Sequence, residues 1–269
     1  MKSITELEEL KTIELNIMKI VHEFCEARAI KYFLTYGTLL GAIRHDGFIP
    51  WDDDIDIHMT REDYDRFRRE FPEWGKERGI VIIDNHTYGN KFPRDIIKVC
   101  DDRTLLVENG YKNKCQLGVF VDIWPIDKVP ETLSLKDKIA ILRIDVIKRM
   151  AQASDLKKSS IQYYRMNWKR KLFVLLFGHG NPSRLVDKQE QLSRKWNSIE
   201  KAQYTSFQAN KRYYLESELF PPQFHKFEDA QFYIPNNYDS ILKKTYGDYM
   251  KLPPINEQVP HHIQDVFWK

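Results

Sequence analysis

Apolar residues recur at steps of three and four near the start of the chain, with charged residues between them. They are Leu7, Leu10, Ile13, Ile17, Ile20 and Phe24. On a helix this spacing gathers them into one stripe, which packs against the rest of the protein. The pattern therefore predicts an N-terminal helix that is buried along one side.

Runs rich in β-branched and aromatic residues follow, and such runs are typical of strands. They are Tyr32–Tyr36, Ile49–Met59, Ile80–Ile83, Ile96–Val99 and Val119–Trp124. After the second run a helix is predicted, because Thr60 can cap it and acidic residues occupy its first turn.

Helices dominate the second half of the chain, as the helical spacing and the capping residues indicate. The predicted helices are Lys136–Ala153, Ile161–Phe177, a third that opens at Asn181-Pro182, and Tyr238–Tyr246, which Gly247 ends. The segment Tyr233–Asn237 is expected to be a loop.

The order of these elements predicts an α+β fold, with a mixed sheet, flanking helices and a mainly helical insertion. Residues 1–132 form the predicted catalytic core, 133–200 a basic helical insertion, and 201–269 a C-terminal segment that returns to the core. Charge marks the insertion. Between Leu133 and Phe177 there are eleven Lys or Arg against three Asp, whereas the net charge of the whole chain is only +3.

Composition excludes several classes of protein. A chain of 269 residues that is 42% hydrophobic can bury a core, and a net charge of +3 is too small to indicate a nucleic-acid binder. From the polar, acidic N-terminus we expect no ordinary secretory signal, and the longest apolar run, 172–177, is far shorter than the ~20 residues that span a bilayer. Three cysteines without CxxC spacing indicate neither a disulfide framework nor a cysteine zinc site. We expect a cytoplasmic protein.

The run Asp52-Asp53-Asp54-Ile55-Asp56 is the main chemical signal. Alternate residues of a strand share a face, so Asp52, Asp54 and Asp56 are predicted to point one way and Asp53 the other. Unpaired carboxylates at this spacing repel one another, and a bound cation offsets that cost. Oxygen ligands favour Mg²⁺ or Mn²⁺. A solvated acidic turn is the alternative reading, whereas an EF-hand is excluded because Ile57 occupies its glycine position.

Two further features point to phosphoryl transfer. Gly37 and Thr38 lie between a predicted strand and a short helix, where free backbone N–H groups can receive a phosphate. Asp122 lies in an apolar strand, where a lone carboxylate is costly. A strand, Gly-Thr, a helix, Asp-x-Asp and a later Asp, in this order, resemble the pattern of the DNA-polymerase-β-like nucleotidyltransferases.

A closer resemblance lies in residues 36–57, YGTLLGAIRHDGFIPWDDDIDI, which resemble the signature of the LicD family. Residues 238–254, YDSILKKTYGDYMKLPP, resemble its closing motif, and the fukutin-related sugar phosphotransferases are similar. The resemblance extends over about residues 20–262 and is weakest within 133–200. It implies a nucleotidyltransferase-like sheet. It also implies transfer of phosphocholine, or a similar phospho-alcohol, from CDP-choline or another CDP-alcohol to a sugar hydroxyl of a teichoic acid, capsule or lipopolysaccharide precursor.

The same resemblance implies the catalytic residues. Asp54, Asp56 and Asp122 carry the reaction, and Asp52 joins them as a ligand of Mg²⁺ or Mn²⁺. Cations neutralise the charge that develops when the donor pyrophosphate breaks. Whether Asp122 also takes the proton of the acceptor hydroxyl, or the metal suffices, stays open.

Four residues near the acidic run are candidate substrate contacts. Arg44 and His45 could hold the donor phosphates, or they could be surface charges at the end of a helix. Trp51 and Trp124 each lie within two residues of a predicted ligand. Their rings could hold a quaternary ammonium through cation–π attraction, or they could simply belong to the core.

Other polar residues carry weaker signals. His58 continues the strand in the register of the carboxylates, where it could support them. The roles of Arg94, Lys98 and the paired His261 and His262 are undecided between site and surface.

Residues 161–178 combine aromatic, cationic and apolar side chains, as interfacial segments do. Peripheral contact with the inner face of the cell membrane would bring the enzyme to a lipid-linked glycan acceptor. A helix-packing face with a solvated basic side is the equal alternative.

Two other functions stay open. The same acidic strand could serve a nucleotidyl- or glycosyltransferase, which breaks a different bond. The chain could also be a non-catalytic, metal-stabilised module that anchors a glycan-assembly complex. No nucleic-acid partner is expected.

Overall fold

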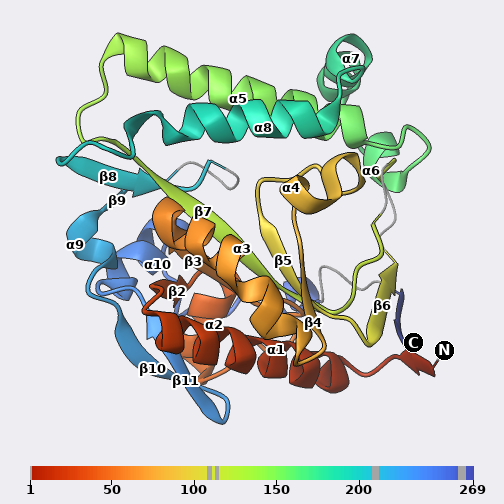
Figure 1. Ribbon diagram of the computed structural model, residues 1–269, viewed down its shortest axis with the longest axis vertical. Helices are drawn as coiled ribbons and strands as arrows, with labels where there is room; N and C mark the ends of the chain where they lie inside the picture. The colour runs from red at the N-terminus through yellow and green to blue at the C-terminus, as the bar shows by residue number, and fades with distance from the viewer. Residues whose placement is uncertain (1, 108–110, 113–114, 208–211, 260–264) are drawn as a thin grey trace.

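The computed structural model describes residues 2–107, 111–112, 115–207, 212–259 and 265–269. A mixed sheet runs through its centre (Figure 1), and within these ranges the sheet has seven strands. Its main path is β2 (Tyr32–Leu34), β3 (Asp56–Thr60), β7 (Phe120–Pro130), β5 (Ile97–Asp101) and β4 (Ile80–Ile83), with β8 (Ala202–Thr205) and β9 (Tyr214–Leu215) beside the end of β7. Strands β3 and β7 are parallel and their other neighbours are antiparallel. The predicted α+β mixed sheet is confirmed.

Two long helices cover one face of the sheet. They are α1 (Leu7–Arg28) and α3 (Arg61–Lys76), which contact each other and β7. Phe24, Phe67 and Phe71 lie fully buried between them. The rings of Phe24 and Phe71 meet edge-on, with their centroids 5.1 Å apart. The predicted cap of α3 is present, because the N–H of Asp63 donates to Thr60 Oγ1 at 3.2 Å.

The other helices lie around this core. They are α2 (Tyr36–His45), α4 (Asn85–Tyr88), α5 (Leu135–Asp155), α6 (Ile161–Tyr164), α7 (Trp168–Phe177), α8 (Pro182–Ser193), α9 (Glu216–Leu219) and α10 (Tyr238–Tyr246), with the 3₁₀ turns η1 (Gly89–Lys91), η2 (Arg194–Trp196) and η3 (Ile255–Glu257). The remaining strands are β1 (Lys2–Ile4), β6 (Thr104–Val107), β10 (Gln223–Phe227), β11 (Ala230–Ile234) and β12 (Asp265–Trp268). Because β1 pairs with β12, the two ends of the chain lie side by side (Figure 1).

The strand predicted over Ile49–Met59 is wrong in its first seven residues. Only β3 is a strand, and the chain before it turns, with the N–H of Asp52 donating to the Ile49 carbonyl at 2.9 Å. The ammonium of Lys11 donates to the Pro50 carbonyl at 2.9 Å. Pro50 also has no N–H to give to a ladder. A contact from α1 therefore fixes this segment outside the sheet.

The helix predicted over Ile161–Phe177 is also wrong, because it is two helices, α6 and α7. Asn167 separates them, and its side chain accepts the N–H of Arg170 at 3.0 Å, which caps α7. The loop predicted over 233–237 begins only after Ile234 in the structure, because β11 includes the first two of these residues. The helix that opens at Asn181-Pro182 and the helix that Gly247 ends are both confirmed.

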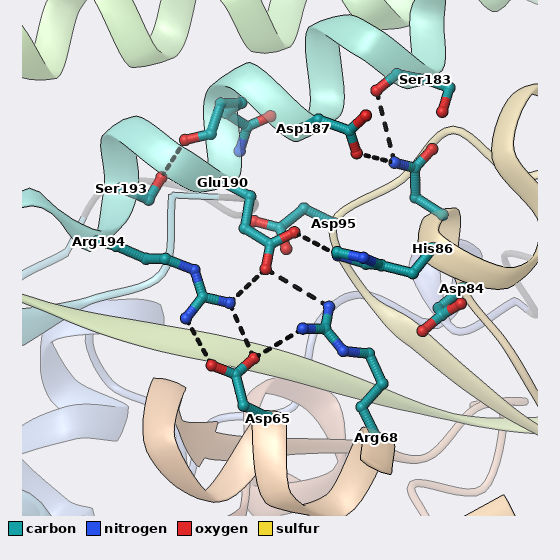
Figure 2. Close-up of polar contacts among 12 residues, drawn as sticks. Asp65, Arg68, Asp84, His86, Asp95, Ser183, Asp187, Glu190, Ser193 and Arg194 are labelled. Carbon is teal, nitrogen blue, oxygen red and sulfur yellow. Dashed lines mark hydrogen bonds and ion pairs between the residues drawn. The ribbon is translucent and has the colours of Figure 1, made fainter.

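The helical layer of α5 and α8 is bound to the core by an ionic network (Figure 2). Glu190 of α8 is its centre. It accepts a hydrogen bond from His86 at 2.8 Å, contacts Arg68 at 3.4 Å and pairs with Arg194, which also binds Asp65 at 2.8 Å.

Behind this network the buried Arg61 binds two further carboxylates. Its guanidinium donates to Asp95 at 3.0 Å and to Asp127 at 2.9 Å. Burial raises the pKa of Glu190, but hydrogen bonds from His86 and Arg194 and the charges of Arg61 and Arg68 more than reverse this effect and hold that pKa below its ordinary value. The helical layer is thus fixed to α3 and the sheet by charges that depend on one another.

Replacing Glu190 by Gln keeps the size of the side chain and removes its charge. We expect the free energy of unfolding at pH 7 to fall by about 3 kcal/mol, because breaking a buried ion pair leaves its partners uncompensated. The folded-state pKa of Glu190 is depressed, so its stabilisation is present above the ordinary value of 4.5 and is lost as the pH falls below it. Urea unfolding of the wild type and of Glu190→Gln from neutral to acid pH measures the difference in free energy of unfolding, which should shrink in acid.

Glu77→Gln is the matched control, because that carboxylate is 80% exposed, and it should change stability by less than about 0.5 kcal/mol. A deficit for Glu190→Gln that stays constant from neutral to acid pH contradicts the role of its charge.

Candidate active site

Asp56 and Asp122 are direct neighbours in the sheet. Asp56 begins β3, Asp122 lies near the start of β7, and the two are register partners on parallel strands. Both residues are buried. Partners on adjacent strands have side chains on the same face. Strand pairing therefore holds two carboxylates side by side in a poorly hydrated place.

Each of these carboxylates has a dedicated hydrogen-bond donor. The indole N–H of Trp124 donates to Asp56 Oδ1 at 2.7 Å. The ammonium of Lys98, which lies opposite Asp122 on β5, contacts both oxygens of Asp122 at 2.8 and 2.9 Å. The N–H of Asp56 donates to Thr38 Oγ1 at 2.8 Å, which fixes the start of β3 to α2. The orientation of both carboxylates is set before any substrate arrives.

The pair carries more negative charge than its donors compensate. Burial raises the pKa of Asp56 well above its ordinary value, and the charges of Asp54 and Asp122 raise it further. The hydrogen bond from Trp124 and the charge of Lys98 act in the opposite direction. Such a pKa indicates a place where a further positive charge is favoured.

A cavity of about 590 Å³ opens beside the pair. The acidic residues that line it in the described chain are Glu6, Glu14, Asp53, Asp54, Asp56 and Asp122, against the basic residues Arg94 and Lys98. Trp124 and Phe120 form part of its wall. The cavity wall therefore combines an excess of acidic over basic groups with aromatic rings.

The prediction that strand alternation separates Asp53 from its neighbours is wrong in its premise. Residues 52–55 are not in a strand, so strand geometry does not assign their side chains to two faces. Asp53 is buried and lines the cavity together with Asp54 and Asp56. Asp52 lies instead against the first turn of α2.

Gly37 provides the space for Asp52. A Cβ placed on Gly37 would lie 2.5 Å from Asp52 Oδ2, closer than two such atoms approach each other. The predicted junction of a strand with a short helix is confirmed here, because β2 ends at Leu34 and α2 begins at Tyr36. The hydroxyl of Thr38 is occupied with β3, so its contribution to the site is to hold Asp56.

Three predicted substrate contacts lie elsewhere. Arg44 and His45 end α2, and Arg44 donates to the carbonyl of Tyr249 at 2.9 Å. Trp51 packs edge-on to His45, with ring centroids 6.4 Å apart. None of these three lines the 590 Å³ cavity, whereas Trp124 does. Their role in substrate binding stays a prediction.

Other polar residues named from the sequence have clear positions. His58 is buried and shares a hydrogen bond with the Tyr36 hydroxyl at 3.0 Å, and burial lowers its pKa to about 3, so it is neutral at pH 7. The guanidinium of Arg94 lies 4.4 Å from the ring centroid of Tyr111, at the cavity wall. His261 and His262 lie outside the described residues.

Two residues at the site had no assigned function in the sequence. Lys98, left undecided, is the ion-pair partner of Asp122. Glu14 was missed, although it follows Ile13 and lies inside the apolar stripe of α1, where a carboxylate is unexpected. That misplaced charge on the helical wheel was the available signal.

The donor atoms around the cavity are hard oxygens of the kind that Mg²⁺ and Mn²⁺ bind. A buried oxygen without a hydrogen-bond partner, Glu14 Oε2, is among them. As the side chains stand, however, no three His, Cys, Asp or Glu residues of the described segments are close enough together to hold one ion. The carboxylates share a cavity, and metal binding stays a prediction.

Residues 29–140 match the family model described as LicD/FKTN/FKRP, nucleotidyltransferase domain. This range contains the cavity carboxylates of the acidic run and of β7, whereas Glu6 and Glu14 lie before it. The chain is also 33% identical to the lipopolysaccharide cholinephosphotransferase LicD of Haemophilus influenzae over 99% of both sequences. The chain belongs to the LicD family of phosphotransferases.

More distant members share only part of this LicD chain. The ribitol 5-phosphate transferases FKRP of Homo sapiens and Mus musculus are 50% identical over 38 residues, which cover 14% of this chain and 8% of theirs. The similarity to the bacterial relative thus extends over the helical layer as well as the sheet, whereas that to FKRP is confined to one short segment.

Gly37→Ala tests whether the position of Asp52 matters for the LicD reaction. The added methyl group would displace the Asp52 carboxylate, while α2 tolerates alanine. We expect a wild-type melting temperature within a few degrees and a fall in phosphotransfer of at least about 10-fold. The check is a double-mutant cycle with Asp52→Asn. If Gly37 acts through Asp52, adding Gly37→Ala to Asp52→Asn has no further effect, and independent losses contradict this link.

Proposed function

We propose that this LicD phosphotransferase moves phosphocholine, or a similar phospho-alcohol, from a CDP-activated donor to a sugar hydroxyl of a cell-surface glycan precursor. The observation that carries the proposal is the buried pair of Asp56 and Asp122 on adjacent parallel strands, which faces a cavity lined by further carboxylates. Similarity over the whole length to a lipopolysaccharide cholinephosphotransferase supports the transferred group and the acceptor class.

Asp54, Asp56 and Asp122 would hold Mg²⁺ or Mn²⁺, and Asp52 and Asp53 lie close enough in sequence to contribute. The excess negative charge of the cavity supports this role. When bound, the metal supplies positive charge against the donor diphosphate as the phosphoanhydride bond breaks.

The chain itself orients the reactants. Trp124 and Thr38 keep Asp56 in place, and Lys98 does the same for Asp122. Arg94, at the cavity wall, is placed to attract a phosphate of the donor. Asp122 is the carboxylate that we assign to receive the proton of the attacking sugar hydroxyl.

Incubation with a panel of CDP-alcohols, a glycan acceptor and Mg²⁺, scored by CMP release and product mass, tests the function. We expect release with CDP-choline or a close relative and loss in excess EDTA. Asp54→Asn and Asp56→Asn should each lower the rate by at least about 100-fold, because they remove charge that acts in the transition state. Asp102→Asn is the control, since that carboxylate is 62% exposed and, among the described residues, contacts Lys269 and does not line the cavity.

Near-wild-type turnover by a folded Asp56→Asn variant contradicts the site. Consumption of a nucleoside triphosphate or of a nucleotide-sugar, in place of a CDP-alcohol, indicates the nucleotidyl- or glycosyltransferase alternative. A metal-dependent rise in melting temperature with no donor consumed indicates the non-catalytic module.

We also infer that α5 and α7 dock on an anionic membrane surface, where lipid-linked acceptors lie. No described helix is long and apolar enough to cross a bilayer. Instead, α5 exposes an apolar stripe at steps of three and four, consisting of Leu135, Ile139, Leu142 and Val146. Its neighbour α7 exposes Trp168, Leu172, Leu175, Leu176 and Phe177. Lys138 and Arg143, which are exposed beside the stripe of α5, add positive charge. Apolar side chains among cations fit an anionic lipid surface.

The double variant Leu142→Ser, Trp168→Ser tests this docking by sedimentation with phosphatidylglycerol vesicles. Both residues are exposed, so folding should be unaffected. Losing two side chains worth about 1.5–3 kcal/mol each when fully buried should weaken binding at least about 10-fold. Leu252→Ser with Ile255→Ser, also exposed, is the control for general hydrophobicity. If the wild-type protein does not sediment, or the double variant sediments equally, the docking surface is wrong.

A further inference from the structure

Glu14 is a buried carboxylate in an apolar position. It lies in the second turn of α1 next to Ile13 and Ile17, and the residue is only 3% exposed. Its Oε2 has no hydrogen-bond partner, and within the described ranges it forms no ion pair. Burying a carboxylate without a partner is costly, so an apolar residue here would make the folded protein more stable.

The surroundings of Glu14 make this cost larger. Its side chain lines the 590 Å³ cavity together with Asp53 and Asp54 of the acidic run. Burial raises its pKa well above the ordinary value, and the charges of Asp54, Asp53 and Asp52 raise it further. Carboxylates of α1, of the acidic run and of β7 therefore line one space.

The position of α1 relative to this space is fixed. Lys11, one turn before Glu14, donates to the carbonyls of Ile49 at 3.4 Å and Pro50 at 2.9 Å. It thereby ties the helix to the segment that leads into the acidic run. Its ammonium is engaged with those carbonyls and with Glu8, so the same helix turn supplies no cation to Glu14.

We propose that Glu14 is a further carboxylate of the divalent-cation site and binds the cation, or a water molecule on it, from the α1 side. This proposal rests on the proposed function, because it concerns the cation that Asp54, Asp56 and Asp122 would hold. It explains why a carboxylate is kept inside an apolar stripe. It also makes α1, which lies outside the matched range 29–140, a part of the site.

Titration of the purified protein with Mn²⁺, followed by calorimetry and by thermal melting, tests the proposal. Glu14→Gln keeps the shape and removes the charge. We expect its dissociation constant for Mn²⁺ to rise by about 10–100-fold, the effect typical of residues that support a metal site. Without metal, its melting temperature should equal or exceed that of the wild type, because a carboxylate that repels its neighbours is gone. The increase in melting temperature on adding Mn²⁺ should become smaller.

Glu23→Gln is the matched control, since it is the same change on the same helix at a carboxylate that is 63% exposed. Its Mn²⁺ affinity should equal that of the wild type. A purely structural Glu14 would show the opposite pattern, with a lower melting temperature without metal and unchanged Mn²⁺ affinity. If Glu14→Gln itself folds poorly, Glu14→Met, which suits the apolar stripe, replaces it in the same titration.

The outcomes separate this proposal from the proposed function. Wild-type Mn²⁺ affinity in Glu14→Gln, combined with lost affinity in Asp56→Asn, overturns the role of Glu14 and leaves the metal site intact. If the wild-type protein binds no Mn²⁺, the metal requirement of the proposed function fails as well. Activity gives a second measure. Raising the Mg²⁺ concentration should restore turnover in Glu14→Gln. It would not do so if Glu14 were the general base that takes the proton of the acceptor hydroxyl.

Discussion

The pairing of β3 with β7 places two buried carboxylates next to each other, and the rest of the site follows from that constraint. Two like charges in a poorly hydrated sheet are tolerated only if neighbouring groups compensate them. Lys98 on the next strand and Trp124 on β7 itself donate to these carboxylates, while Thr38 on α2 accepts the backbone N–H of Asp56 and fixes the start of β3. Strands β5 and β7 thus supply the donors, and α2 fixes the backbone that carries one of the two carboxylates.

Features with local causes could be predicted from the sequence. The stripe of α1, the cap at Thr60 and the glycine that ends α10 each depend on residues within one or two turns. The strand predicted over Ile49–Met59 failed for a non-local reason. Its apolar and acidic residues suit a strand, but Lys11, 39 positions before Pro50, holds that segment outside the sheet. No window of sequence around residue 50 contains this contact.

The kind of chemistry at the site could be predicted from its residue types. A run of Asp with a later Asp in an apolar strand indicated a cluster of carboxylates, and Asp56 and Asp122 do lie together. Which other groups join them depends on topology. Lys98 reaches Asp122 because β5 is its antiparallel neighbour, and Glu14 reaches the cavity because α1 crosses β7.

The helical layer does more than cover the sheet, since a second cavity of about 770 Å³ lies beneath it. Arg94, Tyr111 and Trp124 are among the residues that line both this cavity and the acidic one. Its other side carries cations from α5 and α7, including Lys148 and Arg170. A glycan acceptor is much larger than a donor headgroup and needs such a neighbouring space. Because Glu190 and Arg61 fix the layer to α3 and the sheet, the width of that space depends on the same buried charges that stabilise the fold. The ionic network behind the site thus helps to fix the position of the helical layer relative to the sheet that carries Asp56.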